Sequence, residues 1–169
     1  MVRSLHWLLA IGMIATWFTG HWFNDIHHAL GYATGAIVMM RVLWGWRGDY
    51  YARFTQFVRS PAQTWRYARQ MPDRHEARYL GHNPLGGWMV VVLLSCAALT
   101  SLTGYLFTTD LLWGYDWLAN LHIALSWLMV GLVVLHLLGV AVTSYRHREN
   151  LVRAMITGNK TAPARDDVI

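Results

Sequence analysis

The stretch HIALSWLMVGLVVLH, residues 122–136, decides the fold. It is apolar apart from Ser126, and a histidine stands at each end. On a helix, His122 and His136 would lie about 21 Å apart along the axis and differ by only about 40° around it. The stretch therefore predicts a helix that crosses an apolar layer and presents two imidazoles on one face at two depths.

The composition of the 169-residue chain is that of a membrane protein. Hydrophobic residues make up 55% of it, and charged residues are few and lie between apolar runs. Many of the ten tryptophans stand at the ends of these runs, as expected of aromatic belts at a membrane interface. The net charge is +5, but the charged residues lie between the apolar runs and are not spread over a soluble surface, so we exclude nucleic-acid binding. The single cysteine, Cys96, allows no disulfide framework and no covalent haem motif.

Four apolar runs have the roughly 20 residues that a membrane span requires. They are residues 4–23, 26–46, 85–108 and 118–145. We predict an all-α integral membrane protein in which residues 1–150 form one four-transmembrane-helix bundle, followed by a short cytoplasmic tail at 151–169. Asn24 and Asp25 leave only a short connection between the first two runs, so these should be antiparallel neighbours.

Positive charge predicts the orientation. Seven arginines lie between residues 46 and 84 and more basic residues follow the fourth run, whereas the two opposite connections contain no Lys or Arg. By the positive-inside rule, both termini and the long loop are cytoplasmic. Within that loop, Ser60, Pro61 and Pro72 favour a short helix on the inner leaflet, and a solvated loop is an equal alternative.

The histidines at membrane depth can be paired by level. His6 begins the first run on the inner side, level with His136, and His27 or His28 begins the second run on the outer side, level with His122. Two histidines at each of two depths supply the axial ligands of two low-spin haems in a helical bundle. A zinc site would instead need about four ligands in one place.

Neighbouring residues favour His27 over His28 as the outer ligand. Gly31, Gly35 and Arg41 share a helix face with His27, and Gly20 shares the face of His6 at the outer depth. Glycines permit the close backbone approach that a porphyrin needs. Arg41 would pair with the propionates of the inner haem or extend to a lipid phosphate.

These motifs resemble those of the prokaryotic cytochrome b561 family and of the related cytochrome b subunits of nickel–iron hydrogenases and formate dehydrogenases. The matching residues are His6-Trp7, His27-x3-Gly31 with Arg41, His122-x13-His136, and GHNPLGGWMVVVLL at 81–94. The resemblance implies a multi-pass protein of the bacterial inner membrane with two non-covalent, bis-histidine b haems. It also implies that His27 and His122 hold the outer haem, and that His6 and His136 hold the inner one.

By the same resemblance, electrons would pass between the quinone pool and a redox partner, with quinone oxidoreductase activity as one option. The partner would be a periplasmic c-type cytochrome, a hydrogenase-type enzyme or superoxide. Quinone contacts could come from His82 and Asn83 on the inner side, or from His21 and Asn120 on the outer side.

Two other functions remain open from the residues alone. One is a membrane anchor that docks a peripheral oxidoreductase through HNPLGG and the Arg-rich loop, with structural haems. The other is a proton transporter or channel that uses the histidines as a relay. The acidic residues Asp25, Asp110 and Asp116 all lie at the ends of the runs, which argues against the relay.

Overall fold

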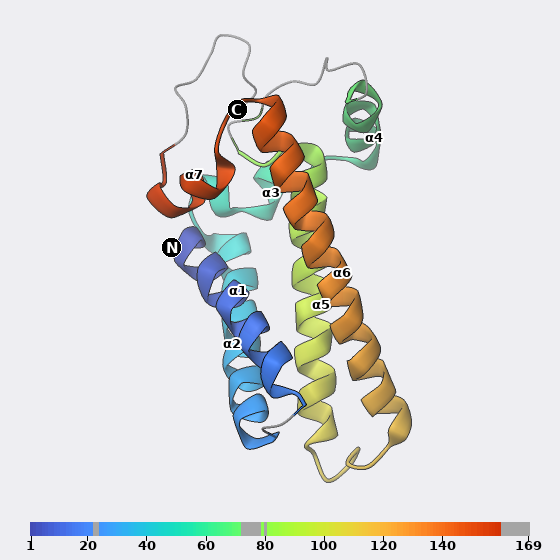
Figure 1. The fold of residues 1–169 in the computed structure, drawn as a ribbon. Coiled ribbons are helices and arrows are strands. Elements are labelled where there is room, and N and C mark those ends of the chain that lie inside the picture. Colours follow the sequence, from blue (N-terminus) through green and yellow to red (C-terminus); the bar gives the residue numbers. More distant parts are fainter. Residues whose placement is uncertain (22–23, 72–78, 80, 160–169) are drawn as a thin grey trace. The chain divides into compact units, whose positions relative to one another are not determined.

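The fold was analysed in a computed structural model that describes residues 1–21, 24–71, 79 and 81–159. Its long helices are α1 (Val2–Thr19), α2 (Asn24–Arg47), α5 (Pro84–Phe107) and α6 (Asp116–Arg146) (Figure 1). They cover the four predicted runs, with ends that differ by up to about four residues, so the helical state of these runs is confirmed. The predicted end of the first run, residue 23, lies outside the described residues.

The chain divides into two compact units, which we describe separately. The first unit comprises residues 1–43 and 93–133, and the second comprises residues 44–92 and 134–169. The first unit therefore contains α1, most of α2, the second half of α5 and the first part of α6.

Two antiparallel helical hairpins make up the first unit. In the hairpin α1–α2, Gly12 lies so close to Thr34 that an added Cβ would stand 2.6 Å from the threonine Oγ1. Only glycine fits at this crossing without a shift of its neighbour. In the hairpin α5–α6, the buried Cys96 Sγ lies 3.5 Å from the carbonyl oxygen of Leu125, to which it donates a hydrogen bond.

Further contacts join the two hairpins into a four-helix bundle. A Cβ at Gly35 of α2 would lie 3.2 Å from the Cβ of Ser101 on α5, so these helices also approach closely. On the other side, the rings of Trp17 and Trp127 meet edge to face with centres 4.8 Å apart, which joins α1 to α6. Each long helix thus contacts two others, as expected for a bundle.

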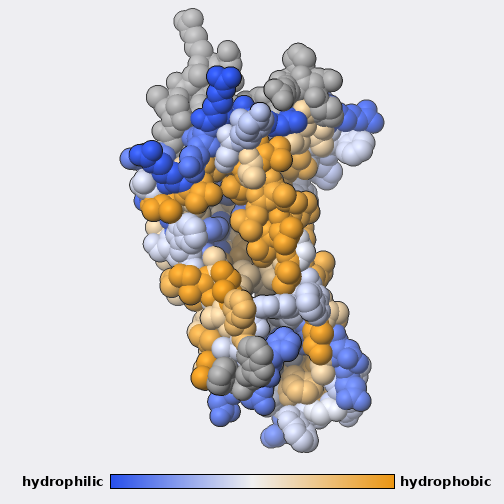
Figure 2. All heavy atoms as spheres, in the orientation of Figure 1, coloured by the Kyte–Doolittle hydropathy of each residue, from blue (hydrophilic) through white to orange (hydrophobic). Residues whose placement is uncertain are grey.

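Hydrophobic side chains remain on the outside of the long helices. Figure 2 shows hydrophobic surface over α6, and on this helix Leu128 and Leu138 are 53% and 58% exposed. In the described part of the chain, α5 and α6 are long and apolar enough to cross a membrane, with mean hydropathies of 2.0 and 2.3. α1 and α2 carry more polar residues, and their crossing of the membrane stays a prediction.

The second unit contains the end of α2 and the remaining parts of α5 and α6. It also contains four short helices: η1 (Tyr50–Ala52), α3 (Phe54–Phe57), α4 (Pro61–Gln70) and α7 (Leu151–Thr157). The predicted start of α4 is confirmed, since Ser60 Oγ accepts a hydrogen bond from the Gln63 amide and Pro61 occupies the first turn. The predicted stop at residue 72 lies outside the described residues, as does the end of the tail from residue 160.

Two side chains tie the loop of the second unit to its long helices. Trp88 Nε1 of α5 donates a hydrogen bond of 3.0 Å to the carbonyl oxygen of Arg59. Arg146 Nη1 at the end of α6 donates one of 2.6 Å to the carbonyl oxygen of Met71. These bonds hold the segment around α4 to parts of α5 and α6 in the second unit.

Candidate functional site

Two histidines from different hairpins face each other in the first unit. The rings of His27 on α2 and His122 on α6 have centres 6.2 Å apart and planes at 89°. Both residues are half-buried. His28 is exposed and touches His27 by a ring edge, so the structure places His27 opposite His122.

The separation of these rings is that of two ligands on one metal. Metal–imidazole bonds are about 2 Å long, and an imidazole nitrogen lies roughly 1.2 Å from its ring centre. A metal between two opposed nitrogens would therefore separate the ring centres by about 6 Å, close to the 6.2 Å between His27 and His122. The pair thus fits an axially ligated haem iron.

Hydrogen bonds to α1 orient the ring of His27. Its Nδ1 lies 2.9 Å from the carbonyl oxygen of Thr16 and 3.5 Å from Thr19 Oγ1. A carbonyl oxygen only accepts hydrogen bonds, so Nδ1 carries the proton and donates it. In the neutral ring, Nε2 then keeps the lone pair that a metal requires.

Hydrogen bonds to α5 orient the ring of His122 in the same way. Its Nδ1 lies 3.1 Å from the carbonyl oxygen of Thr100 and 3.1 Å from Oγ1 of the buried Thr103. Again Nδ1 is the donor and Nε2 keeps its lone pair. A partner on the far nitrogen is the usual support of a metal-binding histidine.

Glycines border both rings. A Cβ at Gly20 would lie 3.3 Å from Cε1 of His27, and one at Gly104 would lie 3.0 Å from Cε1 of His122. Gly20 therefore leaves room for the ring of His27, and its predicted contact with the porphyrin stays a prediction. At Gly31, one turn after His27, a Cβ would meet no described atom within 4 Å, so this position borders open space.

The other predicted ligands fall in different units. His6 is half-buried on α1 in the first unit, with its ring edge-on to Trp7 at 5.2 Å between centres. His136 is half-buried on α6 in the second unit. Their pairing stays a prediction. Arg41 on α2 is only 5% exposed.

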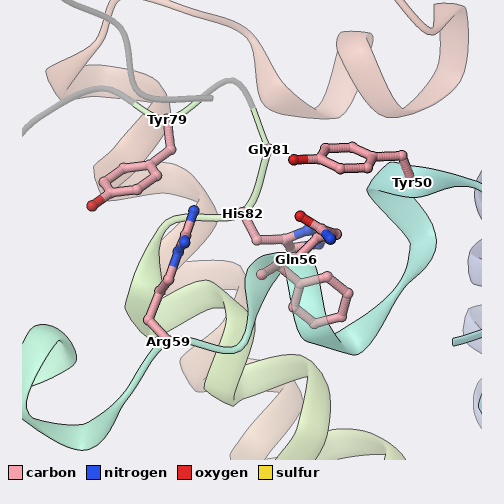
Figure 3. Close-up of a pocket in the computed structure, with 7 residues that line it drawn as sticks. Tyr50, Gln56, Arg59, Tyr79, Gly81 and His82 are labelled. Carbon is pink, nitrogen blue, oxygen red and sulfur yellow. The ribbon is translucent and has the colours of Figure 1, made fainter. Parts of the chain in front are cut away.

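The predicted quinone-contacting residues differ in their surroundings. His82 packs on Phe57, with ring centres 4.8 Å apart, and borders a cavity of about 20 Å³ in the second unit (Figure 3). This volume holds about one water molecule and no quinone ring. Asn83 caps α5, because its Oδ1 accepts a 2.6 Å bond from the amide of Gly86. On the outer side, His21 and Asn120 are both exposed.

Sequence reasoning missed the residues that support the two rings. They are Thr16, Thr19, Thr100, Thr103 and Gly104. A signal was present, since TWFTG at 16–20 and TSLTG at 100–104 share the pattern T-x-x-T-G.

The donor set consists of imidazoles. Within the described ranges, no group of three or more His, Cys, Asp and Glu side chains gathers as for a zinc or calcium site. Two opposed imidazoles, each with Nε2 available, match the axial positions of a haem iron.

Comparison with known proteins agrees with this geometry. The family model of prokaryotic cytochrome b561 matches residues 1–158. A probable Ni/Fe-hydrogenase B-type cytochrome subunit of Rhizobium leguminosarum bv. viciae is 20% identical, over 98% of this chain and 88% of that protein. No solved structure matches the chain. Since the family match covers nearly the whole sequence, the chain belongs to the prokaryotic cytochrome b561 family and is a haem b-containing membrane cytochrome of electron transfer.

Proposed function

We propose that the chain is a transmembrane di-haem cytochrome b that carries electrons between the quinone pool and a redox partner. The observation that carries this proposal is the opposed pair of His27 and His122, with ring centres 6.2 Å apart. A haem held by both imidazoles would have no open position at its iron, which favours electron transfer over the activation of oxygen or substrate there.

The residues of the first unit hold and shield the outer haem. His27 and His122 would hold the haem through Nε2, and hydrogen bonds on Nδ1 keep each ring in place. When bound, haem b supplies a reversible one-electron iron couple. The four helices around the pair exclude water, which limits side reactions.

A second haem is assigned to His6 and His136. α6 runs unbroken from Asp116 to Arg146, so His122 and His136 lie about 21 Å apart along its axis and on nearly the same face. Both His6 and His136 are half-buried, as polar residues within a membrane bundle usually are. Two haems at these depths would let electrons cross most of the apolar layer.

Arg41 is assigned to the propionates of the inner haem. Its side chain is 5% exposed, whereas an arginine that extends to lipid phosphate would keep its charged end at the surface. A carboxylate is the best geometric match of a guanidinium, so a propionate would suit this buried arginine.

We place four spans in the bacterial inner membrane, with both termini in the cytoplasm. The distribution of Lys and Arg supports this orientation. His27 and His122 then lie toward the periplasm and His6 and His136 toward the cytoplasm. Donors and acceptors on opposite sides of the membrane would each face one haem.

Quinol oxidation releases two electrons and two protons, and two one-electron haem centres would suit this donor. The partner on the far side would be a hydrogenase-type enzyme, a periplasmic c-type cytochrome or superoxide. The name of the Rhizobium relative supports the first of these.

That name also supports a second candidate function. The chain would be the membrane anchor of a peripheral oxidoreductase, with haems that mainly stabilise the bundle. This alternative predicts a stable complex with the enzyme but slow oxidation of the reduced haems by quinone.

The proposal is tested on the purified protein in detergent. A pyridine haemochrome assay counts haems per chain, and the spectra before and after dithionite report low-spin b haem. Addition of quinone to the reduced protein then measures the rate of haem oxidation. Two haems and rapid oxidation are expected. Two haems with slow oxidation would favour the anchor, and a folded preparation without haem would reject both functions.

A further inference from the structure

The pattern T-x-x-T-G occurs once in each hairpin of the first unit. One copy, Thr16–Gly20, ends α1 and contacts the histidine on α2. The other, Thr100–Gly104, lies within α5 and contacts the histidine on α6. Each hairpin thus carries the pattern on its first helix and a ligand on its second.

The three pattern positions have the same tasks in both copies. The carbonyl oxygen of the first threonine accepts from the imidazole Nδ1, at 2.9 Å for His27 and 3.1 Å for His122. The hydroxyl oxygen of the second threonine also faces Nδ1, at 3.5 Å and 3.1 Å. The glycine that follows leaves space for the adjacent Cε1 of the ring.

The helix itself determines which way the hydroxyl of the second threonine acts. Thr103 Oγ1 lies 2.9 Å from the carbonyl oxygens of Leu99 and Thr100, to which it donates its one proton. Thr19 Oγ1 donates in the same way to Ala15 and Thr16, at 2.8 and 3.2 Å. With the proton used inside the helix, the hydroxyl oxygen meets the imidazole as an acceptor.

We propose that these two segments, which we call the imidazole clamps, set the reduction potential of the outer haem. Each clamp places two acceptors on Nδ1, which fixes the tautomer and increases the basicity of Nε2. A more basic ligand stabilises ferric over ferrous iron, so the clamps lower the potential. The inference rests on the proposed function, because it requires His27 and His122 to be axial ligands.

The chain offers a matched control for the hydroxyl of Thr103. The side chain of Thr109, outside both clamps, donates to the backbone carbonyl oxygen of Leu106 and does not contact either ring. Thr103→Val therefore removes an acceptor from the ring, and Thr109→Val removes a hydroxyl without doing so. Thr103→Ser keeps the acceptor and tests for rescue.

The experiment is a potentiometric titration of the haem-loaded protein, followed by absorbance, for the wild type and these three variants. Thr103→Val should raise one midpoint potential by up to about 59 mV, equal to a tenfold change in the ferric–ferrous equilibrium for one electron. Thr109→Val and Thr103→Ser should leave both potentials near the wild-type values. If Thr103→Val alone loses one haem, the shift in potential is measured in Thr19→Val, whose hydroxyl faces the other imidazole.

Two results would overturn the inference. One is a Thr103→Val protein with two haems at unchanged potentials, and the other is an equal change in Thr109→Val, which would indicate general packing. Failure of the proposed function gives a different result, because the wild-type protein itself would then lack the expected haem content or the expected oxidation by quinone. If His122→Ala left the haem content unchanged, neither the ligand pair nor its clamp would exist.

Discussion

The two hairpins of the first unit use one device with different geometry. Thr103 Oγ1 approaches His122 Nδ1 to 3.1 Å, whereas Thr19 Oγ1 stays 3.5 Å from His27 Nδ1. The hydrogen bond from Nδ1 to the backbone carbonyl shows the opposite order, since it is 2.9 Å long at His27 and 3.1 Å long at His122. His27 is thus held mainly by backbone and His122 by backbone and hydroxyl together.

The two clamps lie at different places in their helices. α1 ends at Thr19, so the first clamp occupies a helix terminus, where the Thr16 carbonyl oxygen accepts from the Gly20 amide as well as from His27 Nδ1. α5 continues past Gly104 to Phe107, which keeps Thr103 in a regular and buried turn. The closer hydroxyl contact thus belongs to the clamp inside a helix.

The largest effect is expected from removal of either ligand. His27→Ala and His122→Ala should each lower the haem content by one per chain in the pyridine haemochrome assay, because a single imidazole leaves one axial position open. His28→Ala, at an exposed neighbouring position, should retain all haem. Haem added together with imidazole should restore the low-spin spectrum of the ligand variants. Loss of haem in only one of the two histidine variants would show that the two hairpins do not contribute equally to haem binding.

The glycines should give the next largest effect, and an unequal one. A Cβ at Gly104 would stand 3.0 Å from His122 Cε1, and one at Gly20 would stand 3.3 Å from His27 Cε1. Gly104→Ala should therefore weaken haem retention by about 10–100-fold, and Gly20→Ala by less. Haem dissociation to excess apomyoglobin measures this.

Gly131→Ala is the control, because a Cβ there meets no described atom within 4 Å. It should release haem at the wild-type rate. Equal rates for Gly104→Ala and Gly131→Ala would show that the ring at His122 has room to move.

A smaller effect should separate the two hydroxyl acceptors. The contact of 3.5 Å at Thr19 is at the weak limit of hydrogen bonding, while the 3.1 Å contact at Thr103 is well within it. In potentiometric titration, Thr19→Val should shift the midpoint potential in the same direction as Thr103→Val but by less. A larger shift for Thr19→Val would reverse the comparison and assign the stronger clamp to the first hairpin.

The smallest effect concerns the join between the hairpins. The hydroxyl groups of Tyr32 on α2 and Thr108, just after α5, lie 2.7 Å apart in an exposed position. Tyr32→Phe should reduce the free energy of unfolding by about 1 kcal/mol or less, since water replaces the lost partner. Thermal unfolding in detergent measures it, with Tyr145→Phe at a highly exposed site as the control. A loss of several kcal/mol would mean that the hairpins depend on this end for their association.

The sequence predicted those features that depend on distance along a helix. Apolar runs set the ends of the long helices, and helical rise and turn placed His122 and singled out His27 by its face. The clamps were not predicted, because a threonine in an apolar run is most often a packing residue. Their strongest acceptors are also backbone carbonyls, which every residue has. The contact of Gly20 with His27 depends on how α1 crosses α2. Residue spacing within one helix does not predict how two helices cross.

The division of the ligands between two hairpins has a consequence for biogenesis. Synthesis proceeds from the N-terminus, so the first hairpin enters the membrane while His122 has not yet been made. Inserted helices associate afterwards by packing and polar contacts. At that stage the first hairpin would contain only one of the two proposed ligands, His27, and would bind haem weakly. Haem capture becomes a late event that couples the hairpins, and the mature cytochrome should be more resistant to unfolding than its haem-free precursor.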